Sequence, residues 1–234
     1  MSSALLKAFV LFGLASIFGP SLADEDTSPS PATKDGPEQN VDKPWTARAI
    51  VPVFGSVLSI KVPPGFMPAN EEAHDPVYIL ELINEHATLS HWSEMITIKG
   101  WRGSAVDPKS TPVDLMRYIV GNFQSACRET FAATEPESIE IATVPAIRVI
   151  AGCGSVRLPA PPHSELAVIA VFKAGSDFYT VQRAVRGDSA DHPPQIDAKA
   201  LTAKFDQLGP IAICKPGNSA DPVSDPCLHP PSER

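Results

Sequence analysis

The chain has 234 residues, 43% of them hydrophobic and 20% charged, with a formal net charge of −8. These values are typical of a globular protein, and they exclude a disordered chain, a collagen-like fibre and a multi-span membrane protein. The 27 acidic residues outnumber the 19 Lys and Arg residues. Because contacts to phosphate backbones need clustered basic side chains, we expect no nucleic-acid partner.

The first segment, 1–23, has the organisation of an export signal. Lys7 precedes the apolar stretch 8–18, Pro20 ends that stretch, and small residues frame a cleavage point after Ala23. This order is typical of a secretory signal peptide, and the apolar run is shorter than the roughly 20 residues needed to span a bilayer. We therefore predict a periplasmic or secreted protein with no membrane span.

Composition divides the rest of the chain into three segments. Residues 24–44 are rich in Ser, Pro, Asp and Glu. They predict a disordered linker, because they offer almost no apolar surface to offset the entropy of ordering. Residues 45–214 have the usual size of a single domain. Residues 215–234 form a proline-rich tail that contains Cys227.

β-branched and other apolar residues dominate the first part of the domain. We expect four strands there: 48–54, 56–62, 77–83 and 94–99. Gly55 separates the first two runs, and the Pro-Pro-Gly sequence at 63–65 ends the second. Pro52 predicts that the first run is an edge strand, since proline cannot donate to a central ladder. Residues 84–92 are expected to form a loop or a single helical turn.

The spacing of the apolar residues then changes from every second residue, as in a strand, to the spacing of a helix. Ser110, Thr111 and Pro112 supply a hydroxyl cap and a first-turn proline, and Asp114 lies near the positive end of the helix. One apolar face follows at helical spacing: Met116, Ile119, Val120, Phe123 and Cys127. We expect this helix to end near Phe131.

Three or four strands and a second helix are expected in the last part of the domain. The strand candidates are 138–144, 146–153, 165–173 and 178–185, and the helix is 194–208. Residues 165–173 are apolar on both alternations, so they should lie mid-sheet with both faces covered. Gly175 to Asp177 should form a hairpin. The fold class is therefore α+β, with a mainly antiparallel sheet of about six or seven strands and two helices.

The four cysteines all lie in the part of the chain that we expect to be exported. In an oxidising compartment an even number of cysteines favours disulfides, and three pairings are open. We favour Cys127 with Cys153, which would join a helix to a strand, and Cys214 with Cys227, which would close the tail. The sequence lacks the close C-x-x-C spacing of a metal or redox site, so we expect neither.

One short stretch resembles catalytic machinery. Gly187-Asp188-Ser189 resembles the nucleophile block of one lipase and esterase class, and His192 lies nearby. In those enzymes the block follows the first strand of a parallel sheet, whereas here it follows a late strand of an antiparallel sheet. We therefore interpret the stretch as a turn and expect no catalytic residue. The sequence also has no phosphate loop, H-E-x-x-H or dinucleotide motif, and we expect no cofactor.

Three histidines precede the fourth strand: His74, His86 and His91. Their spacing matches no metal-binding pattern, so we expect solvated side chains and no metal. Arg183 lies on the same alternation as apolar residues of its strand, and we expect it to pair with Glu81 or Glu94 in a structural role.

Two tryptophans bracket the strand at 94–99. Trp92 and Trp101, with Tyr78 on the strand before, would form a ligand surface if exposed. The alternative, which we favour, is that these aromatic residues fill the core.

Several stretches in order resemble a group of exported bacterial proteins of unknown function. They include VPPGF at 62–66, HWSEMITIKG at 91–100 and DFYTVQRAVR at 177–186, together with the helix of Cys127, the strand ending in Cys153 and the closing Cys214 and Cys227 pair. In outline the chain is also similar to the Mog1/PsbP-type α/β/α sandwich. That resemblance implies a non-catalytic binding or assembly module.

We therefore predict an exported, non-enzymatic binding or accessory module of the bacterial envelope. Its partner would be a protein or another envelope component, and the sequence does not assign its binding residues. The alternative is a serine hydrolase acting on an envelope substrate, for which Ser189 and His192 are the only candidate pair.

Overall fold

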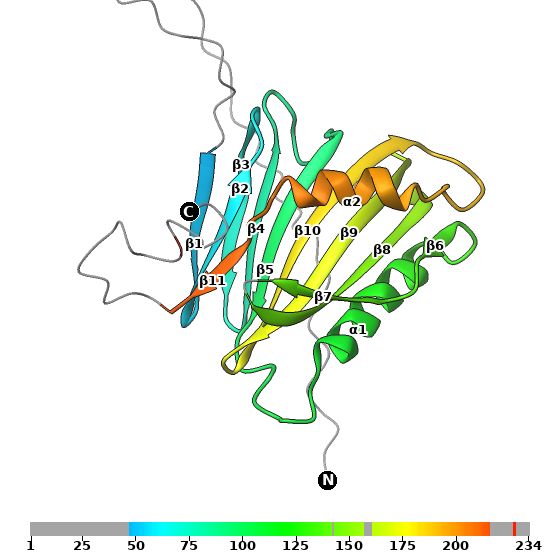
Figure 1. Ribbon diagram of the computed structural model, residues 1–234. Helices are drawn as coiled ribbons and strands as arrows, with labels where there is room; N and C mark the ends of the chain where they lie inside the picture. The colour runs from blue at the N-terminus through cyan, green and yellow to red at the C-terminus, as the bar shows by residue number, and fades with distance from the viewer. Residues whose placement is uncertain (1–46, 142, 157–160, 216–226, 228–234) are drawn as a thin grey trace, which may run out of the picture. The chain divides into compact units, whose positions relative to one another are not determined.

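The computed structural model describes residues 47–141, 143–156, 161–215 and 227 (Figure 1). The predicted signal peptide and linker lie outside these residues, as does most of the tail. Eleven strands and two helices occur in the described part, in this order: β1 (Ala47–Val53), β2 (Ser56–Val62), β3 (Phe66–His74), β4 (Val77–Asn84), β5 (Glu94–Trp101), α1 (Pro112–Ala126), β6 (Phe131–Ala133), β7 (Glu137–Ile141), β8 (Val144–Val156), β9 (His163–Ala174), β10 (Asp177–Asp188), α2 (Ala198–Asp206) and β11 (Ala212–Cys214).

Eight strands form one antiparallel sheet. Its order is β3-β4-β5-β10-β9-β8-β6, and β7 also pairs with β8. β9 lies between β10 and β8, and its residues alternate between two separate hydrophobic cores. This arrangement confirms the prediction that the strand is covered on both faces. The α+β class is likewise confirmed.

The sheet has more strands than we expected from the sequence. β3 has mostly exposed and polar residues (FMPANEEAH), so no apolar alternation marks it. It is a strand because its backbone pairs with β4 at the sheet edge. β6 and β11 have three residues each, which is too short for a pattern to be recognised.

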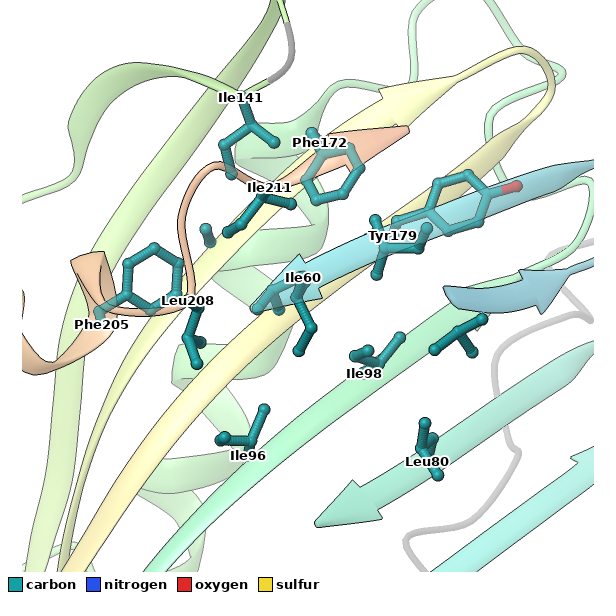
Figure 2. Close-up of a cluster of buried hydrophobic side chains, with 14 of the residues drawn as sticks. Ile60, Leu80, Ile96, Ile98, Ile141, Phe172, Tyr179, Phe205, Leu208 and Ile211 are labelled. Atoms are coloured by element: carbon teal, nitrogen blue, oxygen red, sulfur yellow. The ribbon is translucent and has the colours of Figure 1, made fainter. Parts of the chain in front are cut away.

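A second sheet covers part of one face of the large sheet. It has three strands in the order β1-β2-β11, so the prediction that Pro52 marks an edge strand is confirmed. Gly100 in β5 allows close packing between the sheets, because a Cβ there would lie 2.5 Å from Val53 Cγ1. The small sheet, α2 and the large sheet enclose the larger core, which Figure 2 shows around residues such as Ile60, Phe172 and Phe205.

The opposite face of the large sheet packs against α1. This helix contacts β6, β8 and β9, and Met116 is its one fully buried helical residue. Alternate residues of the central strands, including Val149, Ile169 and Ala184, complete this smaller core. Neither helix, nor any other helix in the described part of the chain, is long and apolar enough to cross a membrane.

The predicted start of α1 is confirmed in detail. Thr111 is the N-cap, its hydroxyl accepts from the backbone N–H of Asp114, and the Asp114 carboxylate accepts from the backbone N–H of Thr111. This capping box satisfies two N–H groups that the helix cannot pair internally. The helix ends at Ala126 rather than near Phe131, because Phe131 pairs with Cys153 as the first residue of β6.

Two disulfides join elements that are distant in the sequence. Cys127 at the end of α1 is bonded to Cys153 in β8, with Cα atoms 5.7 Å apart. Cys214 in β11 is bonded to Cys227, with Cα atoms 6.0 Å apart. This is the pairing favoured from the sequence. The second bond holds residue 227 beside β2, where Cys227 Sγ lies 3.4 Å from the carbonyl oxygen of Val57.

α2 is tied to the large sheet by a network around Arg183, which is 5% exposed. Its Nε and Nη2 donate to Glu94 Oε2 at 3.2 and 2.7 Å, and Nη1 donates to Gln207 Oε1 and to the carbonyl of Lys204. The Lys204 ammonium also donates to Glu94. The predicted pairing with Glu94 is therefore confirmed, whereas Glu81, the other expected partner, lies on the opposite sheet face.

The Glu94 carboxylate should make stability depend on pH. Burial by itself would raise its pKa, but hydrogen bonds from Lys204 and Arg183 outweigh burial and lower the pKa below its ordinary value of 4.5. Since the pKa is lower in the folded chain, this stabilisation is present above pH 4.5 and is lost as the pH falls through the folded pKa.

We expect Glu94→Gln to lower the free energy of unfolding by roughly 2–3 kcal/mol at pH 7, because Arg183 stays buried without its counter-ion. The variant should also lose part of the acid dependence of stability. Urea unfolding at pH 7 and pH 4 measures both effects. Glu137→Gln is the control, because Glu137 pairs with Arg148 but its side chain is 59% exposed. Equal losses in the two variants would contradict a special role for the Arg183 network.

The stabilisation by each disulfide should rise with the logarithm of the length of the loop that it closes. By the loop-entropy relation, removing the Cys127–Cys153 bond, which spans 26 residues, should cost about 3.5 kcal/mol, and removing the Cys214–Cys227 bond, which spans 13, about 3 kcal/mol. Paired Cys→Ala variants of the exported protein, unfolded in urea, test this. Four free thiols in the exported wild-type protein would contradict both bonds.

Candidate functional site

A polar cleft lies at one end of the large sheet, on the face that also contacts α1. It has a volume of about 630 Å³. Three segments line it: 84–87 and 90–93 between β4 and β5, 161–163 at the start of β9, and 186–189 at the end of β10. We refer to this region as the cleft.

Arg186 and Trp92 form the inner wall of the cleft. The guanidinium carbon of Arg186 lies 3.7 Å from the centroid of the Trp92 ring, which is a close cation–π contact. The strand positions the arginine, because its backbone N–H donates to the carbonyl of Ser93 at 2.8 Å. Its side chain makes one hydrogen bond, from Nη1 to the carbonyl of Ser90 at 3.3 Å. Most of the five donors of this half-buried guanidinium therefore make no hydrogen bond within the described protein, and its Nε faces the Glu165 carboxylate at 3.7 Å.

Glu165 lies between Arg186 and His163. Its Oε2 is 3.7 Å from Arg186 Nε and 3.6 Å from His163 Nε2, distances that exceed those of hydrogen bonds. His163 Nδ1 lies 2.8 Å from the carbonyl of Pro161. Because a carbonyl only accepts, Nδ1 carries a hydrogen, and in the neutral ring Nε2 is then an acceptor. Burial lowers the pKa of Arg186, and the nearby Glu165 carboxylate opposes that shift.

Three buried polar atoms of the cleft wall have no hydrogen-bond partner among the described residues: Trp92 Nε1, His163 Nε2 and Arg186 Nε. Trp92 and His163 are each 8% exposed. Leaving a buried polar atom unpaired costs about 1–3 kcal/mol, so native chains pair nearly all such atoms. Two of the three, His163 Nε2 and Arg186 Nε, face the Glu165 carboxylate at 3.6 and 3.7 Å, beyond hydrogen-bond distance. Solvent or a ligand can therefore supply the missing hydrogen bonds.

The rim of the cleft is polar and exposed. It presents the carboxylates of Glu85 and Asp188, the imidazoles of His86 and His91, and the hydroxyl groups of Ser90, Ser93 and Ser189. Among the described residues of the lining, Arg186 is the only Lys or Arg. With neutral histidines, these residues therefore carry more negative than positive charge.

His86 and His91 come together at this rim, whereas His74 ends β3 and is not part of the lining. In the described part of the chain, no group of three or more His, Cys, Asp and Glu side chains is arranged to hold a metal ion. His86 also has a left-handed backbone conformation, with φ at +66°.

The two residues of the hydrolase alternative are not hydrogen-bonded to each other. Ser189 Oγ donates to Ser155 Oγ at 2.9 Å, and His192 Nδ1 lies 3.0 Å from the carbonyl of Pro193. The segment around them packs on β8, because a Cβ on Gly154 would lie 1.9 Å from the carbonyl oxygen of His192. The backbone N–H of Ala190 also donates to the carbonyl of Gly154. This packing explains the stretch without catalysis.

The sequence analysis did not identify Lys99, which lies on the same sheet face between Ile79 and Thr180 on the adjacent strands. No hydrogen bond or ion pair joins its half-buried ammonium to the described residues. Burial lowers the pKa of Lys99, and the carboxylates of Glu81 and Glu165 oppose the shift. Lys99 stands near the end of an apolar run, where a lysine usually faces solvent. Its place in the sequence therefore did not mark it as half-buried.

No protein-family model and no curated protein matches the chain. Among solved structures, the chain is similar to the Ran-binding protein Mog1p of Saccharomyces cerevisiae, with 14% identity over 70% of this chain and 86% of that chain and a TM-score of 0.40. It is similar to PsbP of Synechocystis, with 12% identity over 77% and 98% and a TM-score of 0.44. It is also similar to LpqN, involved in cell envelope biogenesis of Mycobacterium tuberculosis, with 10% identity over 76% and 99% and a TM-score of 0.36.

The sequence outline is similar to the Mog1/PsbP-type fold, and a Mog1 structure and a PsbP structure are both among these similar structures. Likenesses at this identity concern the fold alone and say nothing of what this chain binds.

Substitution of His86 tests the backbone conformation of the cleft rim. A non-glycine residue at positive φ is strained, and the His86 side chain makes a single exposed contact, to Glu85 at 3.7 Å. We therefore expect His86→Gly to raise the free energy of unfolding by roughly 0.5–1 kcal/mol, measured by urea unfolding. His91→Gly is the control, since His91 does not have a positive φ, and it should lower stability. A lower stability for His86→Gly would contradict the strained backbone.

Proposed function

We propose that the protein is exported and acts as a non-enzymatic binding module of the bacterial envelope, with the cleft as its ligand site. The observation that carries the proposal is the set of three buried polar atoms in the cleft wall that have no hydrogen-bond partner within the described protein. A ligand that supplies those partners gains hydrogen bonds that these atoms lack within the described protein.

The surroundings of these atoms support a binding role. The cleft has a volume within the range of about 300–1,000 Å³ that is usual for ligand sites. It lies on a rigid sheet, and Arg186 and Trp92 hold each other in place at its wall. Buried groups that break the rule of full pairing are expected at functional sites.

The hydrolase alternative has less support. A serine nucleophile needs a base within roughly 2.6–3.2 Å, with a third group to orient that base. The hydroxyl of Ser189 is instead hydrogen-bonded to Ser155, and the ring Nδ1 of His192 lies 3.0 Å from the carbonyl of Pro193. We therefore place no step of catalysis on either residue.

Export is supported by two independent features. The segment 1–23 has the pattern of a secretory signal, and the described part of the chain has no free cysteine. Disulfides form and persist mainly in oxidising compartments, such as the periplasm and the cell exterior. We propose that the mature chain functions there.

Site-specific photo-crosslinking tests the binding role. The full chain, with its leader, would carry p-benzoylphenylalanine in place of Ser90 on the cleft rim, or in place of exposed Ala73 on β3 as the control. Irradiation of intact bacteria should give a defined adduct from position 90 and none from position 73, identified by mass spectrometry. Equal adducts at both positions, or none at position 90, would contradict a ligand site at the cleft.

A fluorophosphonate probe tests the alternative. We expect no labelling of the mature wild-type protein, because Ser189 has no histidine partner. Ser189→Ala is the matched variant. Labelling of the wild type that disappears in Ser189→Ala would replace the binding proposal with a serine hydrolase.

A further inference from the structure

The chemical groups of the cleft point to one class of ligand. Resting on the function proposed above, we propose that the cleft binds an uncharged polyhydroxylated ligand, namely a segment of a glycan. The argument uses the charge of the lining, the kinds of atom left unpaired and the exposed groups of the rim.

Charge disfavours an anionic ligand. Glu85 and Asp188 stand on the rim, and Arg186 is the one Lys or Arg among the described residues of the lining. The guanidinium of Arg186 already lies near the Glu165 carboxylate, at 3.7 Å. A phosphate or carboxylate would therefore approach two rim carboxylates to reach a cation that is partly compensated. An uncharged ligand meets no such repulsion.

The unpaired atoms need both kinds of hydrogen-bond partner. Trp92 Nε1 and Arg186 Nε are donors, whereas in the neutral ring His163 Nε2 is an acceptor, because Nδ1 of the same ring donates to the Pro161 carbonyl. A carbonyl group or a carboxylate can only accept. A hydroxyl group both donates and accepts, so a polyol can satisfy all three atoms.

The rim extends the same chemistry. The carboxylates of Glu85 and Asp188 accept from hydroxyl groups, and the hydroxyls of Ser90 and Ser189 can either donate or accept. An apolar ligand would displace water from all of these groups without replacing the hydrogen bonds that the water makes. The mixture of acceptors, hydroxyls and a single cation is suited to a ligand with many hydroxyl groups and no charge.

Ligand binding must also move part of the rim, because the three unpaired atoms are buried in this structure. The segment 85–93, which joins β4 to β5, is the part that would shift, since it lies outside the strands and contains one bridge, between Thr88 and His91. Trp92 belongs to this segment and stacks on Arg186. Its fluorescence should therefore change when a glycan binds.

The test uses the mature full chain and two neutral probes, the β-1,4-linked tetramer of N-acetylglucosamine and maltotetraose. Isothermal titration and tryptophan fluorescence measure binding, and inorganic phosphate serves as the anionic comparison. We expect at least one glycan to bind more tightly than phosphate. Asp188→Asn should weaken that binding about tenfold, because a hydrogen bond to a charged group is lost.

Asp191→Asn is the matched control, because Asp191 is an exposed carboxylate three positions along the chain that does not line the cleft. It should change the dissociation constant less than twofold. Thermal unfolding of both variants checks that they are folded. An equal loss of affinity in the two variants, or tighter binding of phosphate than of either glycan, would overturn the proposal.

Co-sedimentation with purified cell-wall sacculi distinguishes two sources of the same chemistry. If the protein sediments with the sacculi and the soluble tetramer prevents this, the ligand is a wall polymer. If the protein binds the tetramer but does not sediment with the sacculi, the ligand is a free saccharide. No binding of either glycan at about 10 mM, together with a protein adduct from position 90, would overturn the glycan while leaving the binding module in place. Absence of both glycan binding and adduct would overturn the two proposals together.

Discussion

The structure depends on burying both faces of the central strands β8, β9 and β10. Because side chains alternate across a strand, each of these strands contributes residues to two separate cores. One face is covered by α1, and the other by α2 with the small sheet. The remaining features follow from this need, including the close approach of β1 to Gly100 and the disulfide that joins α1 to β8.

The same alternation separates two arginines of β10 that are three positions apart. Arg183 points to the side of α2, where Glu94, Gln207 and the end of the helix satisfy its donors. Arg186 points to the other side, where it stacks on Trp92 and makes one side-chain hydrogen bond. One arginine therefore holds the fold together. The other lies at the wall of the cleft, with its Nε facing the Glu165 carboxylate.

The candidate site is assembled from parts of the chain that are distant in the sequence. Trp92 follows β4, His163 begins β9 and Arg186 ends β10, and antiparallel pairing brings these positions to the same end of the sheet. The catalytic alternative rested on residues that are neighbours in the sequence, Ser189 and His192, which are not hydrogen-bonded to each other in space. Nearness along the chain was a poor guide, because a site on a sheet is built across strands.

The sequence by itself determined much of the local structure. The α+β class, the capped start of α1, the edge position of β1 and the two-faced burial of β9 could all be predicted, because propensity, capping and apolar alternation act between near neighbours. Only the tertiary structure decided that β3 is a strand, that Lys99 makes no hydrogen bond or ion pair within the described residues, and that Trp92, His163 and Arg186 share one cleft. These features depend on strand order and register, which are set by contacts between residues far apart in the chain and leave no periodic pattern in it.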